Sequence, residues 1–254
     1  MIIKDHASEA GHWYTRKGEP MYTVIGKTTG KPRNTTLKDA KELNLVPSVT
    51  TINNVLAKPT LTAWLQQQAI LAALTLPRED GEPESVWLKR VLQDSKQQGR
   101  DAADLGTQIH AAVQSFYEGR KESRFPHHVE SCKNVIQARF GDLKWICEKS
   151  FAHELGFGGK CDMLNTDGEG IVLDIKTKDF SDLSKPLWYK ENLLQLAAYR
   201  EGLGYPGARC ANVFVSRTNP DLAVVHEWAE DDLKRGWKMF QKILEYWQLE
   251  TQHE

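Results

Sequence analysis

The sequence predicts an α/β fold, and two features indicate it. In the middle of the chain, strand-like runs at 158–164 and 171–178 are joined by a short polar turn, and a second pair of alternating runs follows at 210–216 and 222–228. Before, between and after these runs, apolar residues are spaced as in amphipathic helices. With 254 residues, 40% of them hydrophobic, the chain can bury one substantial core, so we expect a single domain over 1–254.

The N-terminal part of the chain is expected to be mainly helical. Glycines and prolines interrupt 14–49, which predicts short strands and turns there. The apolar spacing then becomes helical, with a break at the polar loop 78–84. These features predict an α-rich elaboration over 1–100 and place the core at 101–254. The helices expected in this half of the chain span 49–76, 85–128 and 132–140.

The C-terminal part alternates strands with helices. Asp167 and Gly168 form a tight-turn signal, which predicts that the runs on either side pair as a hairpin. The run 191–200 has helical spacing, and the last segment carries an apolar stripe at helical intervals. The remaining expected elements are a strand at 144–152, a second hairpin at 210–228, and a closing helix striped by Leu233, Trp237, Phe240, Leu244 and Trp247.

Acidic and basic side chains gather on the central hairpin. Because side chains at i and i+2 of a strand share a face, Asp174 and Lys176 point together, while Leu173 and Ile175 point to the opposite, apolar side. The hairpin should bring Asp162 toward Asp174. Two carboxylates beside a lysine suit a Mg²⁺ or Mn²⁺ ion and a water-activating group. The alternative is that Asp-x-Lys forms a solvated ion pair on the strand surface.

Two helices carry further polar groups. Gln195 and Tyr199 are four residues apart and therefore share one face of the 191–200 helix. His110 lies beside the apolar stripe of an upstream helix, one turn after Gly106, whose missing side chain leaves room for a close neighbour. Each has a structural alternative: His110 as a hydrogen-bonded core residue, and the Gln–Tyr pair as an ordinary helix-surface pair.

The order of these motifs is a helix with His, a strand with Asp, a D-x-K strand and a helix with Q-x-x-x-Y. It resembles the RecB-type branch of the PD-(D/E)xK nuclease superfamily. The resemblance implies a restriction-endonuclease-like core over 101–254, with a mixed central sheet flanked by helices. It also implies that the catalytic residues are Asp162, Asp174 and Lys176. The metal ligands it implies for one or two Mg²⁺ or Mn²⁺ ions are His110, Asp162, Asp174 and the main-chain carbonyl of Ile175, and the helix residues beside DNA are Gln195 and Tyr199.

The N-terminal segment extends the resemblance. The run 12–14 (His-Trp-Tyr) and the run 46–52 (Val-Pro-Ser-Val-Thr-Thr-Ile) are similar to the front end of phage-encoded exonucleases of this branch. Ser48 and Thr50 could donate hydrogen bonds to a DNA phosphate, although we favour an N-terminal cap for the helix that follows. Phage relatives of this type pass strands to a single-strand annealing protein, so a partner of that kind is compatible with the resemblance.

The charge balance is unusual for a protein that binds a polyanion. The net charge is -1, from 33 basic and 34 acidic residues, which favours a local basic track, including Lys178 as a DNA contact, over a broad adhesive surface. Glu148, on the strand before the hairpin, is either an additional acid of the site or a solvated surface group. The four cysteines are scattered without a C-x-x-C pair, unlike the arrangement of relatives that carry an iron-sulfur cluster, so we expect no iron-sulfur cluster.

These patterns together predict a metal-dependent DNA exonuclease that acts in phage recombination or DNA processing. The alternatives are a metal-dependent endonuclease of the same fold, a noncatalytic nucleic-acid-binding protein, and an interaction protein whose motif residues form surface ion pairs. A DNA channel walled by the N-terminal portion could be closed by one chain or by a homo-oligomer. Without an apolar stretch of about eighteen residues or a signal-peptide pattern, we expect no membrane association and a cytoplasmic location, in the bacterial host if phage-encoded.

Overall fold

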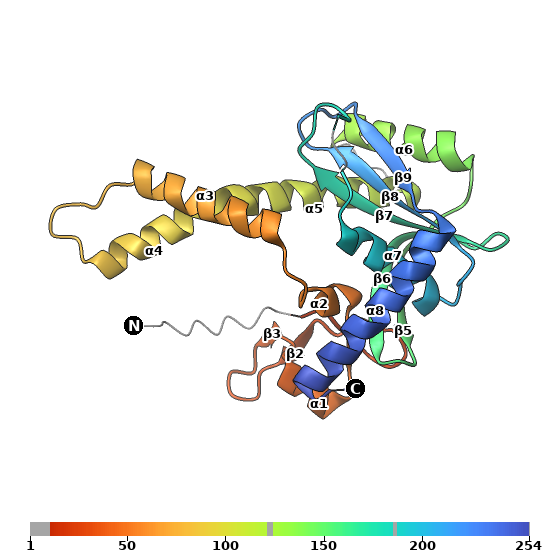
Figure 1. The fold of residues 1–254 in the computed structure, drawn as a ribbon, viewed down its shortest axis with the longest axis horizontal. Coiled ribbons are helices and arrows are strands. Elements are labelled where there is room, and N and C mark those ends of the chain that lie inside the picture. The colour runs from red at the N-terminus through yellow and green to blue at the C-terminus, as the bar shows by residue number, and fades with distance from the viewer. Residues whose placement is uncertain (1–10, 121–123, 185–186, 254) are drawn as a thin grey trace.

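The computed structural model describes residues 11–120, 124–184 and 187–253. Its centre is a five-stranded mixed sheet in the order β5-β6-β7-β8-β9, in which β7 and β8 run parallel and the other neighbours antiparallel. The expected α/β fold, a mixed central sheet flanked by helices, is confirmed (Figure 1). The strands are β5 (Ile146–His153), β6 (Phe157–Asn165), β7 (Ile171–Lys178), β8 (Arg209–Ser216) and β9 (Ala223–Glu227).

Helices cover both faces of this sheet. On one face, α5 (Gln97–Tyr117) packs against the odd-numbered residues of β7, and α6 (Pro126–Phe140) packs against β8 and β9. On the other face, α7 (Lys190–Gly202) and α8 (Glu230–Thr251) pack together, and α7 crosses over between the parallel strands β7 and β8. Burial on both faces is why the middle strands read as nearly continuous apolar runs. The predicted stripe of the closing helix is confirmed, since four of its five members are buried in this core.

Short strands precede the sheet, as the glycines and prolines predict. β1 (Trp13–Tyr14) pairs with β4 (Val46–Pro47), and β2 (Thr23–Ile25) pairs with β3 (Pro32–Asn34). One expectation for this segment is wrong, because α1 (Leu37–Leu43) is a helix where only strands and turns were predicted. Its cause is a capping box in the sequence Thr-x-x-Asp at 36–39, in which each side chain accepts from the backbone N–H of the other residue.

The predicted helix at 49–76 is two helices, α2 (Val49–Asn53) and α3 (Pro59–Thr75). Pro59 occupies the first position of α3, where its missing N–H costs nothing, so it starts a new helix rather than continuing the old one. α3, α4 (Glu84–Ser95) and the beginning of α5 project from the sheet as an arm (Figure 1). Within the described residues, none of the helices combines the length and apolar content that a membrane span requires.

Candidate metal centre

The candidate site lies where strands β6 and β7 separate. The two strands pair over 163–165 and 171–173, which confirms the hairpin predicted from the tight turn. Beyond these residues the ladder stops, and the carboxylate Oδ2 of Asp162 accepts the backbone N–H of Ile175 at 2.6 Å. Because the N–H and C=O of one strand residue point to the same side, the carbonyl of Ile175 faces the same opening.

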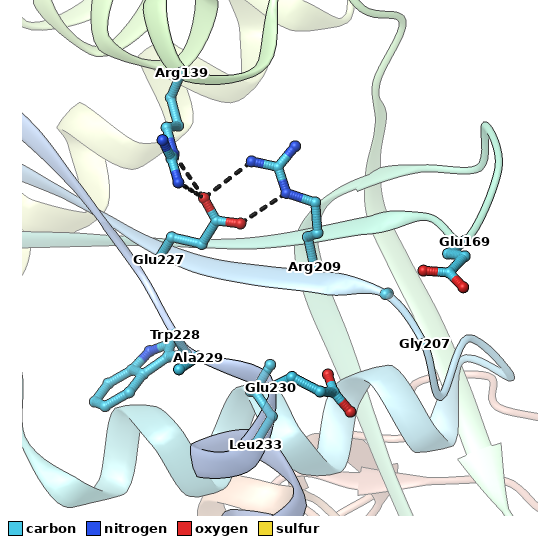
Figure 2. Close-up of a pocket in the computed structure, with 10 residues that line it drawn as sticks. Arg139, Glu169, Gly207, Arg209, Glu227, Trp228, Ala229, Glu230 and Leu233 are labelled. Atoms are coloured by element: carbon cyan, nitrogen blue, oxygen red, sulfur yellow. Dashed lines mark hydrogen bonds and ion pairs between the residues drawn. The ribbon is translucent and has the colours of Figure 1, made fainter.

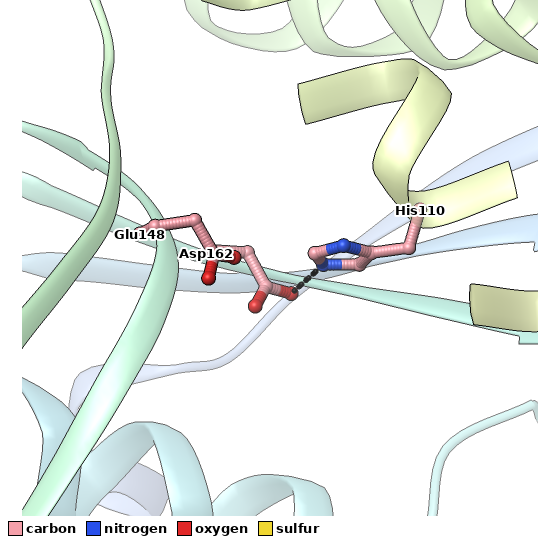
Figure 3. Close-up of side chains that lie close together, drawn as sticks. All are labelled: His110, Glu148 and Asp162. Carbon is pink, nitrogen blue, oxygen red and sulfur yellow. Dashed lines mark ion pairs between the residues drawn. The ribbon is translucent and has the colours of Figure 1, made fainter. Parts of the chain in front are cut away.

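Three side chains of metal-ligand type converge on this opening from three elements (Figure 3). His110 comes from α5, Glu148 from β5 and Asp162 from β6. One nitrogen or oxygen atom of each lies within 4.8 Å of those of the other two, and Nε2 of His110 is 3.1 Å from Oδ2 of Asp162. Ligands at about 2.1–2.6 Å from a shared cation stand a few ångströms apart, so one divalent ion could contact all three.

Two backbone features bring these side chains together. A Cβ on Gly106 would stand 2.4 Å from the hydroxyl oxygen of Thr177, so the missing side chain lets α5 approach β7 one turn before His110, as the sequence predicts. Glu148 has a φ of 54°, which is strained for a side chain other than glycine, and the β5–β6 ladder is interrupted where Glu148 faces Asp162. The strain turns the glutamate toward the opening instead of leaving it in the ladder.

Asp174 and Lys176 lie on the same face of β7, as the alternation predicts, and Ile175 lies on the opposite face. Asp174 is 1% exposed, so it is not part of a solvated ion pair on a strand surface. Its Oδ1 accepts from the ammonium of Lys176 at 2.7 Å, and its Oδ2 accepts from the amide of Asn212 at 2.7 Å. Asn212 sits beside Asp174 on β8, and its own Oδ1 accepts from the indole N–H of Trp228 at 2.8 Å.

Asn212 and Trp228 are site residues that the sequence reasoning missed. The signal that could have found the first is a lone asparagine inside the apolar run 210–216, because a buried amide needs hydrogen-bond partners. No comparable signal marks Trp228.

Burial and neighbouring charges shift the pKa values of the ionisable groups in the site. Burial raises the pKa of Asp174 to about 6, and the neighbouring Asp162 carboxylate adds to the rise while Lys176 opposes it. Burial also acts to raise the pKa of Asp162, but the hydrogen bond and positive charge of His110 and the charge of Lys176 outweigh it, so this pKa lies below its ordinary value. For both His110 and Lys176, burial acts to lower the pKa, and the surrounding carboxylates more than compensate, so both pKa values are raised.

The donor set fits a hard divalent cation. Carboxylates of Asp162 and Glu148, the carbonyl of Ile175 and the imidazole of His110 are ligand types that Mg²⁺ and Mn²⁺ accept. A cation here would relieve the repulsion from Asp162, which adds to the effect of burial in raising the pKa of Asp174. Because a ligating imidazole must be neutral, cation binding would also release the proton that the pairing with Asp162 favours on His110.

The predicted Gln–Tyr pair faces the sheet. Gln195 and Tyr199 are both buried on α7, and the amide of Gln195 donates to the Tyr199 hydroxyl at 2.9 Å, so the shared helix face is confirmed. The Tyr199 ring packs edge-on against Phe151 of β5 at a centroid distance of 5.6 Å. A direct contact of this pair with DNA stays a prediction.

Lys178 is held by neighbours rather than extended into solvent. Its ammonium donates to the carbonyl of Leu187 and lies 3.7 Å from the centroid of the Tyr189 ring. Burial and then the positive charge of Lys176 lower the pKa of Lys178 to about 8. These contacts leave its predicted role as a phosphate contact untested.

Ser48 is the N-cap of α2, which confirms the favoured interpretation of the 46–52 run. Its buried hydroxyl accepts the backbone N–H of Thr51 at 3.0 Å. Thr50 is exposed, and its hydroxyl lies 3.2 Å from that of Ser48. A phosphate contact by either side chain stays a prediction.

Two surface depressions differ in what they can do. One of about 430 Å³ is open to the candidate site, since His110, Lys176 and Thr177 help to line it. The other, of about 650 Å³, lies near the start of β8 and is lined by Glu169, Glu227 and Glu230 (Figure 2). Glu227 accepts from Arg209 at 2.7 and 2.9 Å and from Arg139 at 2.6 Å. The two guanidinium groups neutralise the Glu227 carboxylate, and the ion pair with Arg139 ties α6 to the sheet.

Comparisons with known proteins give distant similarities in solved structures. No protein-family model matches the chain, and no curated protein matches it. The crystal structure of SSO0001 has a TM-score of 0.33 and 14% identity over 73% of this chain and 87% of that one. The "Putative exonuclease" of Eubacterium rectale has a TM-score of 0.37 and 11% identity, over 55% of this chain and 66% of that one. The alkaline exonuclease of Laribacter hongkongensis has a TM-score of 0.29 and 15% identity, over 57% of this chain and 84% of that one.

Proposed function

We propose that this chain is a Mg²⁺- or Mn²⁺-dependent deoxyribonuclease that hydrolyses phosphodiester bonds from DNA ends. The observation that supports it best is the convergence of His110, Glu148 and Asp162 at the opening between β6 and β7. The buried pair of Asp174 and Lys176 lies on the strand that borders this opening. A cation site beside a fixed ammonium can catalyse phosphodiester hydrolysis, because both groups stabilise negative charge on the phosphate.

The roles of the residues follow from their chemistry. Asp162, Glu148 and His110 would hold the cation, together with Asp174 and the Ile175 carbonyl. When bound, Mg²⁺ or Mn²⁺ supplies a Lewis acid for the phosphate and lowers the pKa of an attacking water. Lys176 keeps its proton because its pKa is raised, so it acts as a donor to a phosphate oxygen or to the water rather than as a base.

Action from DNA ends is the finer part of the proposal. With a net charge of -1, the protein lacks the excess of basic residues that a broad adhesive surface needs, so sustained digestion requires the strand to be enclosed. The arm formed by α3, α4 and the beginning of α5 projects from the sheet (Figure 1), and α5 continues from it to His110, so the arm would form one wall of such a channel. A role in phage recombination, with an annealing protein as partner, belongs to the same proposal.

We further propose that the arm contacts a second copy of this chain. Its outer part exposes six aliphatic residues by 43% to 75%, which together amount to roughly 500 Å² of apolar surface spread over α3 and α4. A standard interface takes about 800 Å² from each partner, somewhat over half of it apolar. If a second copy covered both helices of the arm, this area would be about what one side of a stable dimer needs. The six residues are Ile70, Leu71, Leu74, Val86, Leu88 and Leu92.

The test of the nuclease proposal compares linear DNA with covalently closed circular DNA at the same Mg²⁺ concentration. We expect the linear DNA to be degraded from its ends, the circle to persist, and EDTA to stop the reaction. Lys176→Ala, purified in the same way, controls for a contaminating nuclease. Equal cleavage of both forms would replace the exonuclease with an endonuclease, and binding of DNA without cleavage would leave a noncatalytic DNA-binding protein.

A further inference from the structure

An apolar groove of about 700 Å³ lies between the beginning of α3 and the beginning of α7. Two aromatic rings help to line it, Trp64 from the second turn of α3 and Tyr189 from the residue that precedes α7. The amines at its rim belong to Lys58 and Lys190, and its one acidic residue is Glu191. The groove thus combines flat apolar walls with a small excess of positive charge.

The aromatic walls are held in place by the rest of the fold. The ring of Tyr189 is positioned by the Lys178 ammonium, 3.7 Å from its centroid, and the residue is still 53% exposed. Trp64 rests on α5 at Gly99, where an added Cβ would stand 3.5 Å from the indole ring. Both rings are therefore positioned by contacts within the protein, without a bound ligand, and can stack on a flat ligand.

The groove lies close to the candidate metal centre. Lys178 follows Lys176 by two residues on the same face of β7, and two residues of a strand span about 7 Å. The Tyr189 ring packs against the ammonium of Lys178. A DNA strand whose phosphate lies at Lys176 would therefore reach the groove within a few nucleotides.

We propose that this groove binds unpaired nucleotides of the strand that enters the site, with their bases stacked on Tyr189 and Trp64. This inference rests on the proposed function, and it adds that the substrate is single-stranded where it meets the protein. Inside a duplex each base already stacks on both neighbours, and only the terminal pair of an end exposes one face, so an unpaired strand is what can offer successive base faces to these rings. The rim amines of Lys58 and Lys190 complement the phosphates, and base–aromatic stacking accepts any sequence.

The test measures DNA binding without cleavage. The probe is a fluorescein-labelled oligothymidylate, titrated with the full chain in EDTA and followed by fluorescence anisotropy. Stacking contributes about 1–3 kcal/mol per base, so Tyr189→Ala should weaken binding roughly 5- to 150-fold. Tyr189→Phe keeps the aromatic face and should bind within about twofold of the wild type. The matched control is Tyr246→Ala on α8, where the tyrosine is 55% exposed, and it should bind as the wild type does.

The outcomes separate this inference from the nuclease proposal. Unchanged binding in Tyr189→Ala would refute the proposal that the groove binds nucleotides, and so would an equal loss of binding in Tyr246→Ala. With either result, a protein partner would be the remaining candidate for the groove. If the wild type binds the probe through Tyr189 but never cleaves it with Mn²⁺, the nuclease proposal fails and the groove stands. Thermal melting of each variant in EDTA excludes loss of folding as the cause of weaker binding.

Discussion

Replacing Asp174 by Asn removes a negative charge from a buried side chain and keeps its shape. In the metal-free protein the pKa of this carboxyl is about 6, raised from 3.8, so the folded state holds the proton more tightly than the unfolded chain does. A shift of about two units corresponds to roughly 3 kcal/mol. The wild type should lose this stability as the pH rises from about 4 to about 6, because folding then keeps an ionised carboxylate in a buried site. The Asn variant has no such loss.

The substitution also has a cost that does not depend on pH. Trp228 fixes the amide of Asn212 so that its Nδ2 points at residue 174. If the introduced Asn keeps its side-chain oxygen toward Lys176, its own amide nitrogen faces the Nδ2 of Asn212. Two hydrogen-bond donors then face each other, and an unsatisfied buried donor costs about 1–3 kcal/mol. The wild type has already lost about 1 kcal/mol at pH 4.5 and about 3 kcal/mol at pH 7, so in EDTA the variant should be less stable than the wild type by up to about 2 kcal/mol at pH 4.5. At pH 7 it should be as stable as the wild type or more stable by up to about 2 kcal/mol.

The assay is urea unfolding followed by tryptophan fluorescence, in EDTA, at several pH values. Asp142→Asn removes an exposed carboxylate and is the matched control for the change of charge. With Mn²⁺ present, cleavage by Asp174→Asn should fall by more than the roughly 10- to 100-fold that loss of an outer-shell partner costs. A stability difference between the Asp174 variant and the wild type that is the same at pH 4.5 and 7 would refute the electrostatic reasoning. Retained metal-dependent cleavage would remove Asp174 from the site.

Three further predictions test separate parts of the molecule. Lys176→Ala should lose about 100-fold or more in turnover while its Mn²⁺ affinity in calorimetry stays within a few-fold, because the ammonium acts on the phosphate and not on the metal. His110→Ala should raise the Mn²⁺ concentration needed for half-maximal activity by about tenfold or more. In EDTA the same variant should lose about 1 kcal/mol of stability at pH 6 and less at pH 9 in urea unfolding, because a histidine with a raised pKa stabilises the fold at low pH and loses that effect as the pH rises through its folded pKa. Leu74→Glu on the arm should shift the protein to monomer in light scattering, whereas Leu249→Glu on α8 should not, although the two leucines are 75% and 74% exposed.

Each of these predictions has a contrary outcome. Loss of Mn²⁺ binding by Lys176→Ala, at unchanged melting temperature, would take the lysine out of the catalytic role. An unchanged Mn²⁺ requirement in His110→Ala, combined with lower stability, would leave the histidine as a structural partner of Asp162. A wild-type protein that is monomeric at micromolar concentrations would refute the contact through the arm.

Local periodicity explains how much of the molecule could be predicted. The alternation of 171–178 places Asp174 and Lys176 on one face, and the tight turn at Gly168 makes the hairpin. Four-residue spacing likewise places Gln195 beside Tyr199. These are properties of single elements or of neighbours joined by a short turn, so the sequence carries them directly. Even here a short-range signal was missed at α1, where a capping box starts a helix of only seven residues.

Contacts between distant elements were decided by the tertiary structure. Glu148 joins His110 and Asp162 through a positive φ and an interrupted ladder, which no spacing in the sequence encodes. Asn212 meets Asp174 only because β7 and β8 pair in parallel in one register.

The groove beside the candidate site depends on tertiary packing in the same way. Its two aromatic walls, Trp64 and Tyr189, are 125 residues apart in the chain and belong to different helical segments. Periodicity fixes which face of its own element a side chain occupies. Which faces then meet depends on how the apolar surfaces of all the elements pack together, and that is a property of the whole chain rather than of any segment.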